Sequence, residues 1–137
     1  MNTESLSVLD LQSRLTGAEK ALILDVRTPV EFAEVHAVRA VNVPLDRLNV
    51  ESLAQVGGVA LTQPVYLLCR GGQRATTAAE KLRSLGYTHP VVIVGGTLAW
   101  IAAGLPVVRG ASRVISLERQ VRIAAGALVL TRVPQLA

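Results

Sequence analysis

The residues of this chain with the clearest capacity for chemistry surround its single cysteine, Cys69. The residues that follow it are Arg70, Gly71, Gly72, Gln73 and Arg74. Successive N–H groups in a tight glycine turn can bind an anion, and the arginines add full positive charges. We therefore expect Cys69 to be a nucleophilic thiolate in a site that attracts anions. The alternative is a buried apolar cysteine, which the neighbouring glycines and arginines disfavour because they are poor material for a core.

The elements around Cys69 are expected to place it at the end of a strand. The apolar run 65–68 directly precedes it and predicts a buried strand, and residues 75–85 predict a helix that ends at Gly86. The other expected strands cover residues 21–26, 40–43 and 91–94. The other expected helices begin at Ser7, at Thr28 with a capping box to Glu31, and at Asp46, with a short one around Trp100. This alternation predicts an α/β domain with a parallel sheet and helices on both faces, whose ligands bind at the carboxyl ends of the strands.

The composition excludes several classes of protein. A chain of 137 residues with 50% apolar residues fits one domain and is not a disordered protein. One cysteine and two histidines exclude a disulfide framework, and no metal site is expected. Aromatic residues make up 3%, too few for a base-stacking surface, and the arginines are scattered, so no nucleic-acid partner is expected. The first residues lack the pattern of a secretory signal, so a cytoplasmic location is expected.

Three segments together resemble the rhodanese-type sulfurtransferases. The loop Cys69–Arg74 is similar to the active-site loop of that family. Residues 24–32, Leu-Asp-Val-Arg-Thr-Pro-Val-Glu-Phe, are similar to its Asp-Val-Arg segment, and residues 95–107 are similar to its closing Gly-Gly…Trp…Gly-Leu-Pro signature. The resemblance implies one rhodanese-like α/β domain over residues 1–109, with residues 110–137 as a separate tail.

The resemblance also implies a reaction. Cys69 would take a sulfane sulfur from a small anionic donor, thiosulfate or a persulfide, and carry it as a cysteine persulfide. It would pass this sulfur to cyanide, a small thiol or a protein thiol. No metal or organic cofactor is implied. Because Cys69 is the only cysteine, the acceptor is expected to come from outside the chain.

Two charged residues after the first buried strand, Asp25 and Arg27, are expected to support the site. From the residue types alone, they are expected to form a structural ion pair that fixes the following loop. The resemblance implies that their segment lies near the active loop and orients Arg74. Arg74 either recognises the donor anion or pairs with Asp25 or Glu31, and the sequence leaves these alternatives open. Arg70 is expected at the rim of the pocket, where it would steer anions.

Two other functions are consistent with a cysteine and an arginine in one loop. The first is a rhodanese-related phosphatase or arsenate reductase. Phosphatase loops of this type place five residues between cysteine and arginine, whereas this chain has four between Cys69 and Arg74. The shorter loop favours a single sulfur atom over a tetrahedral phosphate. The second is a non-catalytic rhodanese-like binding module, a class that commonly lacks the cysteine.

The tail has a different character from the rest of the chain. Residues 110–137 carry four arginines and one glutamate, and their apolar residues predict a helix over 114–130. This segment resembles the start of the membrane region in membrane-associated bacterial rhodaneses. The uncharged stretch 123–131 is shorter than the ~20 residues that a bilayer span requires. Contact with the inner membrane surface, or a homodimer through the same apolar face, is therefore expected.

Overall fold

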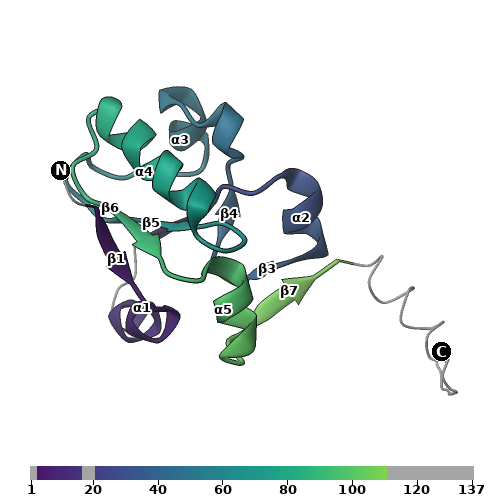
Figure 1. Ribbon diagram of the computed structural model, residues 1–137. Helices are drawn as coiled ribbons and strands as arrows, with labels where there is room; N and C mark the ends of the chain where they lie inside the picture. The colour runs from purple at the N-terminus through teal and green to yellow at the C-terminus, as the bar shows by residue number, and fades with distance from the viewer. Residues whose placement is uncertain (1–2, 17–20, 111–137) are drawn as a thin grey trace, which may run out of the picture.

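The computed structural model describes residues 3–16 and 21–110 (Figure 1). Its main sheet has five strands in the order β1-β6-β5-β2-β4, and each neighbouring pair is parallel. The strands are β1 (Glu4–Leu6), β2 (Leu22–Asp25), β4 (Val41–Asn42), β5 (Val65–Leu68) and β6 (Pro90–Ile93). The three central strands, β6, β5 and β2, are buried along their whole length, which is why each appears in the sequence as a mostly apolar run; β2 ends at the buried Asp25.

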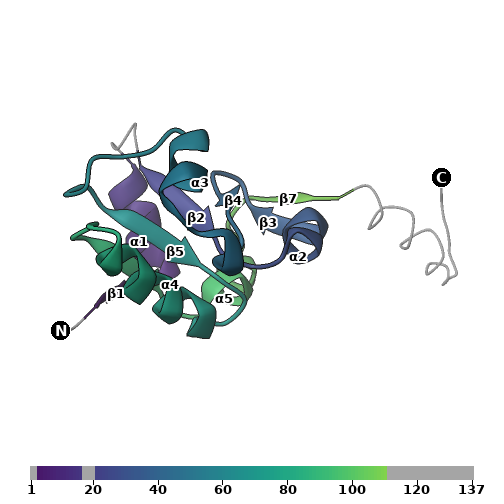
Figure 2. The ribbon, with the colours of Figure 1, turned by 90° about the horizontal axis from the view of Figure 1, so that it is seen from above.

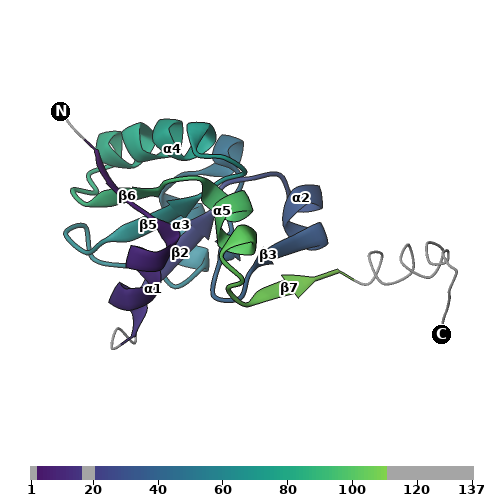
Figure 3. The ribbon, with the colours of Figure 1, turned by 60° about the horizontal axis from the view of Figure 1, so that its bottom comes forward.

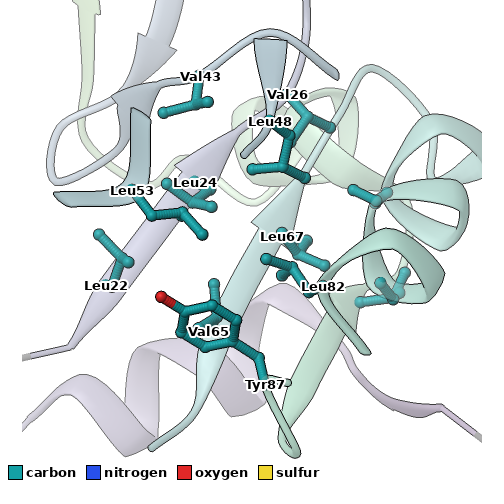
Figure 4. Close-up of a cluster of buried hydrophobic side chains, with 14 of the residues drawn as sticks. Leu22, Leu24, Val26, Val43, Leu48, Leu53, Val65, Leu67, Leu82 and Tyr87 are labelled. Atoms are coloured by element: carbon teal, nitrogen blue, oxygen red, sulfur yellow. The ribbon is translucent and has the colours of Figure 1, made fainter. Parts of the chain in front are cut away.

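Helices cover both faces of the sheet, which confirms the expected α/β architecture (Figure 3). The helices α3 (Val50–Gln55) and α4 (Gln73–Ser84) pack on one face, over the apolar cluster that Figure 4 shows. The helices α1 (Val8–Leu15) and α5 (Gly96–Ala102) pack on the other face, where Leu11 and Trp100 belong to a second cluster. Alternate side chains of one strand enter the two clusters, as with Leu67 in the first and Leu68 in the second.

The helix starts follow the capping pattern of the sequence at two places and depart from it at a third. Ser7 accepts a hydrogen bond from the N–H of Asp10, and Thr28 forms the expected capping box at the start of α2 (Pro29–Glu34). The helix expected to begin at Asp46 is instead a short 3₁₀ turn, Leu45–Arg47, and α3 begins later. The prediction at Asp46 is wrong because Asn49 forms a reciprocal cap with Ser52, which fixes the start of α3 at Val50.

Three strands are not apparent from the sequence. One is β1, and the other two, β3 (Val35–Ala37) and β7 (Val107–Arg109), form a separate antiparallel ribbon. Figures 1 and 2 both place this ribbon and α2 to one side of the main sheet. The ribbon joins segments about seventy residues apart in the sequence, and each is only three residues long. Such short strands lack the alternation that periodicity analysis needs.

The C-terminal helix expected over residues 114–130 lies outside the described residues, as does the proposed membrane or dimer contact through it. Both stay predictions. Among the helices of residues 3–16 and 21–110, none has the length and apolar character needed to cross a bilayer.

Candidate active site

Cys69 directly follows β5, the central strand of the sheet, at the carboxyl end where parallel sheets bind ligands. Its side chain is nearly buried, with 1% of its surface exposed. The N–H of Gly72 donates a hydrogen bond of 2.9 Å to Cys69 Sγ. The loop therefore curls over the sulfur and directs a backbone donor at it, an arrangement that stabilises negative charge on a thiolate or a persulfide.

The start of α4 adds further donors to this site. Gly72 is the N-cap residue, with φ of +122°, and it has no side chain that could cap the helix. The first N–H groups of a helix have no partner inside the helix, and they carry the positive end of its dipole. In the described part of the chain no side chain caps α4. The sequence expectation of a helix N-terminus behind Cys69 is thus confirmed, and the helix begins at Gln73 rather than Ala75.

The first turn of α5 supports the loop through backbone hydrogen bonds. The N–H of Thr97 donates to the carbonyl of Cys69 over 2.8 Å, and that of Leu98 donates to the carbonyl of Arg70 over 3.3 Å. Gly96 permits this contact, because a Cβ at that position would lie 2.3 Å from the Cys69 carbonyl oxygen. The backbone of Gly96 also has φ of +57°, a conformation that favours glycine.

Asp25 and Arg27 form a buried ion pair beside the loop. Strand β2 pairs with β5 so that Asp25 lies opposite Leu68, one residue before Cys69. Arg27 Nη2 donates to Asp25 Oδ2 over 2.7 Å and to the carbonyl of Val35 over 2.7 Å. The structure therefore contains the ion pair expected from the residue types, and the pair ties β2 to β3. Asp25 makes no hydrogen bond to Arg74.

Arg74 pairs with Glu31, which decides between the two partners that the sequence left open. Arg74 Nη1 and Nη2 donate to the two carboxylate oxygens of Glu31 over 2.8 and 3.0 Å. Glu31 also accepts from Thr28 at the start of α2, so one carboxylate caps that helix and holds the loop arginine. The hydrogen bond from Arg74 lowers the pKa of Glu31 to about 2. The pKa of Arg74 is raised, chiefly by Glu31, and the charge of Cys69 acts in the same direction.

Replacement of this carboxylate should cost little stability and leave a distinct pH signature. Glu31→Gln keeps a helix-capping oxygen and removes the charge, so we expect a loss of about 1 kcal/mol at pH 7 for this half-exposed pair. Because the pKa of Glu31 falls from 4.5 to about 2 on folding, its contribution is complete above pH 4.5 and disappears as the pH falls toward 2. Thermal unfolding of both proteins from pH 7 to pH 3 measures this difference.

The control for that measurement is Glu51→Gln, which removes a glutamate from the first turn of α3 in the same way. This variant removes the same charge from a helix start without breaking an ion pair with Arg74, so the comparison isolates the effect of that ion pair. A stability difference at Glu31 that does not shrink as the pH falls would contradict the role of its ion pair with Arg74.

An open hollow of about 500 Å³ lies over the loop. Its lining residues are Cys69, Arg70, Gly71, Gln73, Arg74 and Leu98. Five of the predicted loop residues therefore meet in one space, and Gly72 contributes its N–H to the sulfur. Arg70 is exposed there, as expected for a residue that steers anions. Asp25 and Arg27 do not line this hollow and form a buried ion pair instead.

Two residues of the site, Gly96 and Thr97, were not singled out from the sequence as part of it. The Gly95–Gly96 pair was the available signal, since adjacent glycines before a helix indicate a turn with positive φ. Which backbone that turn would approach depends on the pairing of β5 with β6, and this pairing is a property of the sheet.

Comparison with known proteins assigns the chain to a family. Residues 7–103 match the family model described as the rhodanese-like domain. The chain belongs to the rhodanese-like domain family. Its relatives include a sulfurtransferase of Allochromatium vinosum, 31% identical over 98 residues, which cover 72% of this chain and 88% of that protein. An uncharacterized protein of Synechocystis is 40% identical over 120 residues, 88% of this chain and 65% of its own length.

The fold comparison agrees with this assignment. The crystal structure of a thiosulfate sulfurtransferase from Pseudomonas aeruginosa superposes with a TM-score of 0.69 at 28% identity. The match covers 86% of this rhodanese-like chain and 23% of the Pseudomonas protein. The rhodanese-like fold expected from the sequence motifs is therefore confirmed.

Proposed function

We propose that this rhodanese-like domain is a sulfurtransferase that carries sulfane sulfur as a persulfide on Cys69. The observation that carries the proposal is the hydrogen bond from the N–H of Gly72 to Cys69 Sγ at the uncapped start of α4. A persulfide places its negative charge on the outer sulfur, and backbone N–H groups around a nucleophile stabilise such charge without reorganisation. The sulfurtransferase names of relatives support the same reaction class.

The first half of the reaction loads the cysteine. The Cys69 thiolate attacks the outer sulfur of thiosulfate, the sulfur–sulfur bond of thiosulfate breaks, and its electron pair leaves with sulfite. Arg70 is exposed at the rim of the hollow and attracts the dianionic donor. Both terminal nitrogens of Arg74 are held by Glu31, so Arg74 contributes a fixed positive charge at the edge of the hollow.

The second half returns the enzyme to its starting state. A nucleophilic acceptor attacks the outer sulfur of the persulfide, and the electron pair of the broken bond returns to Cys69. With cyanide the product is thiocyanate. The reaction consumes no oxidant or reductant. Cys69 is the only cysteine in the 137 residues, so no second cysteine among them can accept the sulfur, and a separate acceptor takes it.

A thiosulfate:cyanide assay combined with mass spectrometry tests the proposal. Incubation with thiosulfate alone should add about 32 Da, the mass of one sulfur atom, to Cys69. Addition of cyanide should remove this mass and yield thiocyanate. No mass increase on Cys69 together with no thiocyanate would refute the proposed function.

The phosphatase alternative makes a different prediction. We expect negligible hydrolysis of aryl phosphates, because the loop has four residues between Cys69 and Arg74 and because Arg74 donates both terminal nitrogens to Glu31 rather than to an anion above the sulfur. Phosphate release from p-nitrophenyl phosphate measures this activity, with thiocyanate formation on the same preparation as the reference. Cys69-dependent phosphate release at a comparable rate would favour the phosphatase.

A further inference from the structure

A second cavity lies next to the active hollow, with a volume of about 300 Å³. Its polar lining comes from Arg27, Glu31, Glu34, Arg70 and Thr97. Arg70 and Leu98 line both this cavity and the hollow over Cys69, so the two spaces adjoin. The elements that supply the lining, α2, β3 and α5, lie near one another in Figure 1, and α5 packs on β3. Cys69 lines the hollow and not this cavity, so a ligand of the cavity would have to extend past Arg70 and Leu98 to meet the sulfur.

Thr97 lines this cavity and carries a buried hydroxyl. Its side chain is 1% exposed, and Oγ1 has no hydrogen-bond partner among the described residues. A buried hydroxyl without a partner costs free energy that a valine of the same shape avoids. The N–H of Thr97 already holds the carbonyl of Cys69, so the hydroxyl lies on the same residue that supports the loop. A ligand in the cavity that bonds Oγ1 offsets this cost.

Arg27 supplies donors to the lining of the same cavity. Its side chain is buried, with 5% of the residue exposed, and its hydrogen bonds to Asp25 and Val35 use Nε and Nη2. A guanidinium has five N–H donors, and among the described residues the two on Nη1 make no bond. These donors, the Thr97 hydroxyl and the exposed guanidinium of Arg70 are a suitable set for a carboxylate.

Carboxylates line the same cavity. Glu31 is held by Arg74, and Glu34 is exposed at the end of α2. A carboxylate has about four lone-pair sites, so Glu34 can accept from an ammonium group in addition to its other partners. The two guanidinium groups and two carboxylates of the lining balance in charge. A ligand that carries one carboxylate and one ammonium matches this lining better than an anion or a cation does.

We propose that this cavity binds the α-amino-acid group of a thiol that accepts the sulfur from Cys69, with its carboxylate on Arg27 and Thr97 and its ammonium on Glu34. The proposal rests on the proposed function, since it names the acceptor of that reaction. The acceptor thiol loses its proton to solvent, and its thiolate attacks the outer sulfur of the Cys69 persulfide. The sulfur–sulfur bond to Cys69 breaks, its electron pair stays on Cys69, and the product is the persulfide of the acceptor.

Three acceptor thiols distinguish the contribution of the carboxylate from that of the ammonium group. L-cysteine carries both, 3-mercaptopropionate lacks the ammonium, and cysteamine lacks the carboxylate. For each thiol, kcat/KM is measured with thiosulfate as the donor and divided by kcat/KM for cyanide, an acceptor that has neither charged group. This ratio is then compared between the variant and the wild type. Thr97→Val should lower the ratio about tenfold for L-cysteine and 3-mercaptopropionate and leave that for cysteamine unchanged. Glu34→Gln should lower it for L-cysteine and cysteamine only.

The matched control is Thr77→Val, the same chemical change in a residue that lines a different hollow. It should leave all three ratios as in the wild type. A decrease of all three ratios together in Thr97→Val, or no decrease in any, would overturn the proposal, because a merely structural effect does not distinguish thiols by their charged groups.

A binding measurement separates this proposal from the proposed function. L-alanine has the same amino-acid group and no thiol, so its binding does not depend on sulfur transfer. Titration of the wild-type protein with L-alanine should shift the backbone amide resonances of Val35 and Leu98, and Thr97→Val should weaken these shifts. If the wild-type protein transfers no sulfur to cyanide but shows the shifts, the proposed reaction is refuted and binding of the amino-acid group in the cavity is supported. Absence of the shifts refutes binding of the amino-acid group in the cavity.

Discussion

Cys69→Ser is expected to abolish sulfur transfer and leave the domain folded. A serine hydroxyl cannot carry a persulfide, and no other cysteine in the 137 residues can replace it, so we expect a loss of at least about a thousandfold in kcat/KM. The side chain is buried at the carboxyl end of β5, and a hydroxyl still fits beside the N–H of Gly72. Thiocyanate formation measures activity, and thermal unfolding measures the fold.

Two results together confirm the role of Cys69. The variant should gain no mass of sulfur after incubation with thiosulfate, and its unfolding temperature should stay close to that of the wild type. Thiocyanate formation by Cys69→Ser at a rate near that of the wild type would show that sulfur transfer does not pass through this residue.

Gly96→Ala is expected to have the second largest effect, although Gly96 carries no reactive group. Its added Cβ would lie 2.3 Å from the carbonyl oxygen of Cys69 and 2.8 Å from that of Arg70, so the loop has to move. A displacement of about 1 Å at a catalytic group can cost about a hundredfold in rate. We therefore expect kcat/KM to fall about a hundredfold per folded molecule, with a lower unfolding temperature.

Gly104→Ala is the matched control, because it separates backbone strain from the close approach. Gly104 has φ of +74°, near the +57° of Gly96, but nothing lies within 4 Å of a Cβ added there. The left-handed conformation costs a non-glycine residue roughly 1–2 kcal/mol, so this variant should also be less stable. Its activity per folded molecule should equal that of the wild type. Equal activity losses in the two variants would contradict a specific contact between Gly96 and the loop.

The order of elements and the reactive loop could be predicted from the sequence because both are local. The buried strands β2, β5 and β6 are mostly apolar runs, and Thr28 with Glu31 is a recognisable capping box. The loop from Cys69 to Arg74 is contiguous, so the cysteine, the glycine turn and the start of the helix necessarily lie together. Residue type and spacing within a few positions contain all of this information.

The partners of that loop could be decided only by the tertiary structure. Arg74 pairs with Glu31, 43 residues away, although Asp25 was an equal candidate in the sequence. Asp25 forms its ion pair with Arg27, and Gly96 approaches Cys69 from the start of α5, which follows β6. The same holds for the ribbon of β3 with β7 and for the cavity at Thr97. These contacts depend on the order and register of parallel strands and on which side chains the packed core leaves beside one another, and residue spacing along the chain does not encode them.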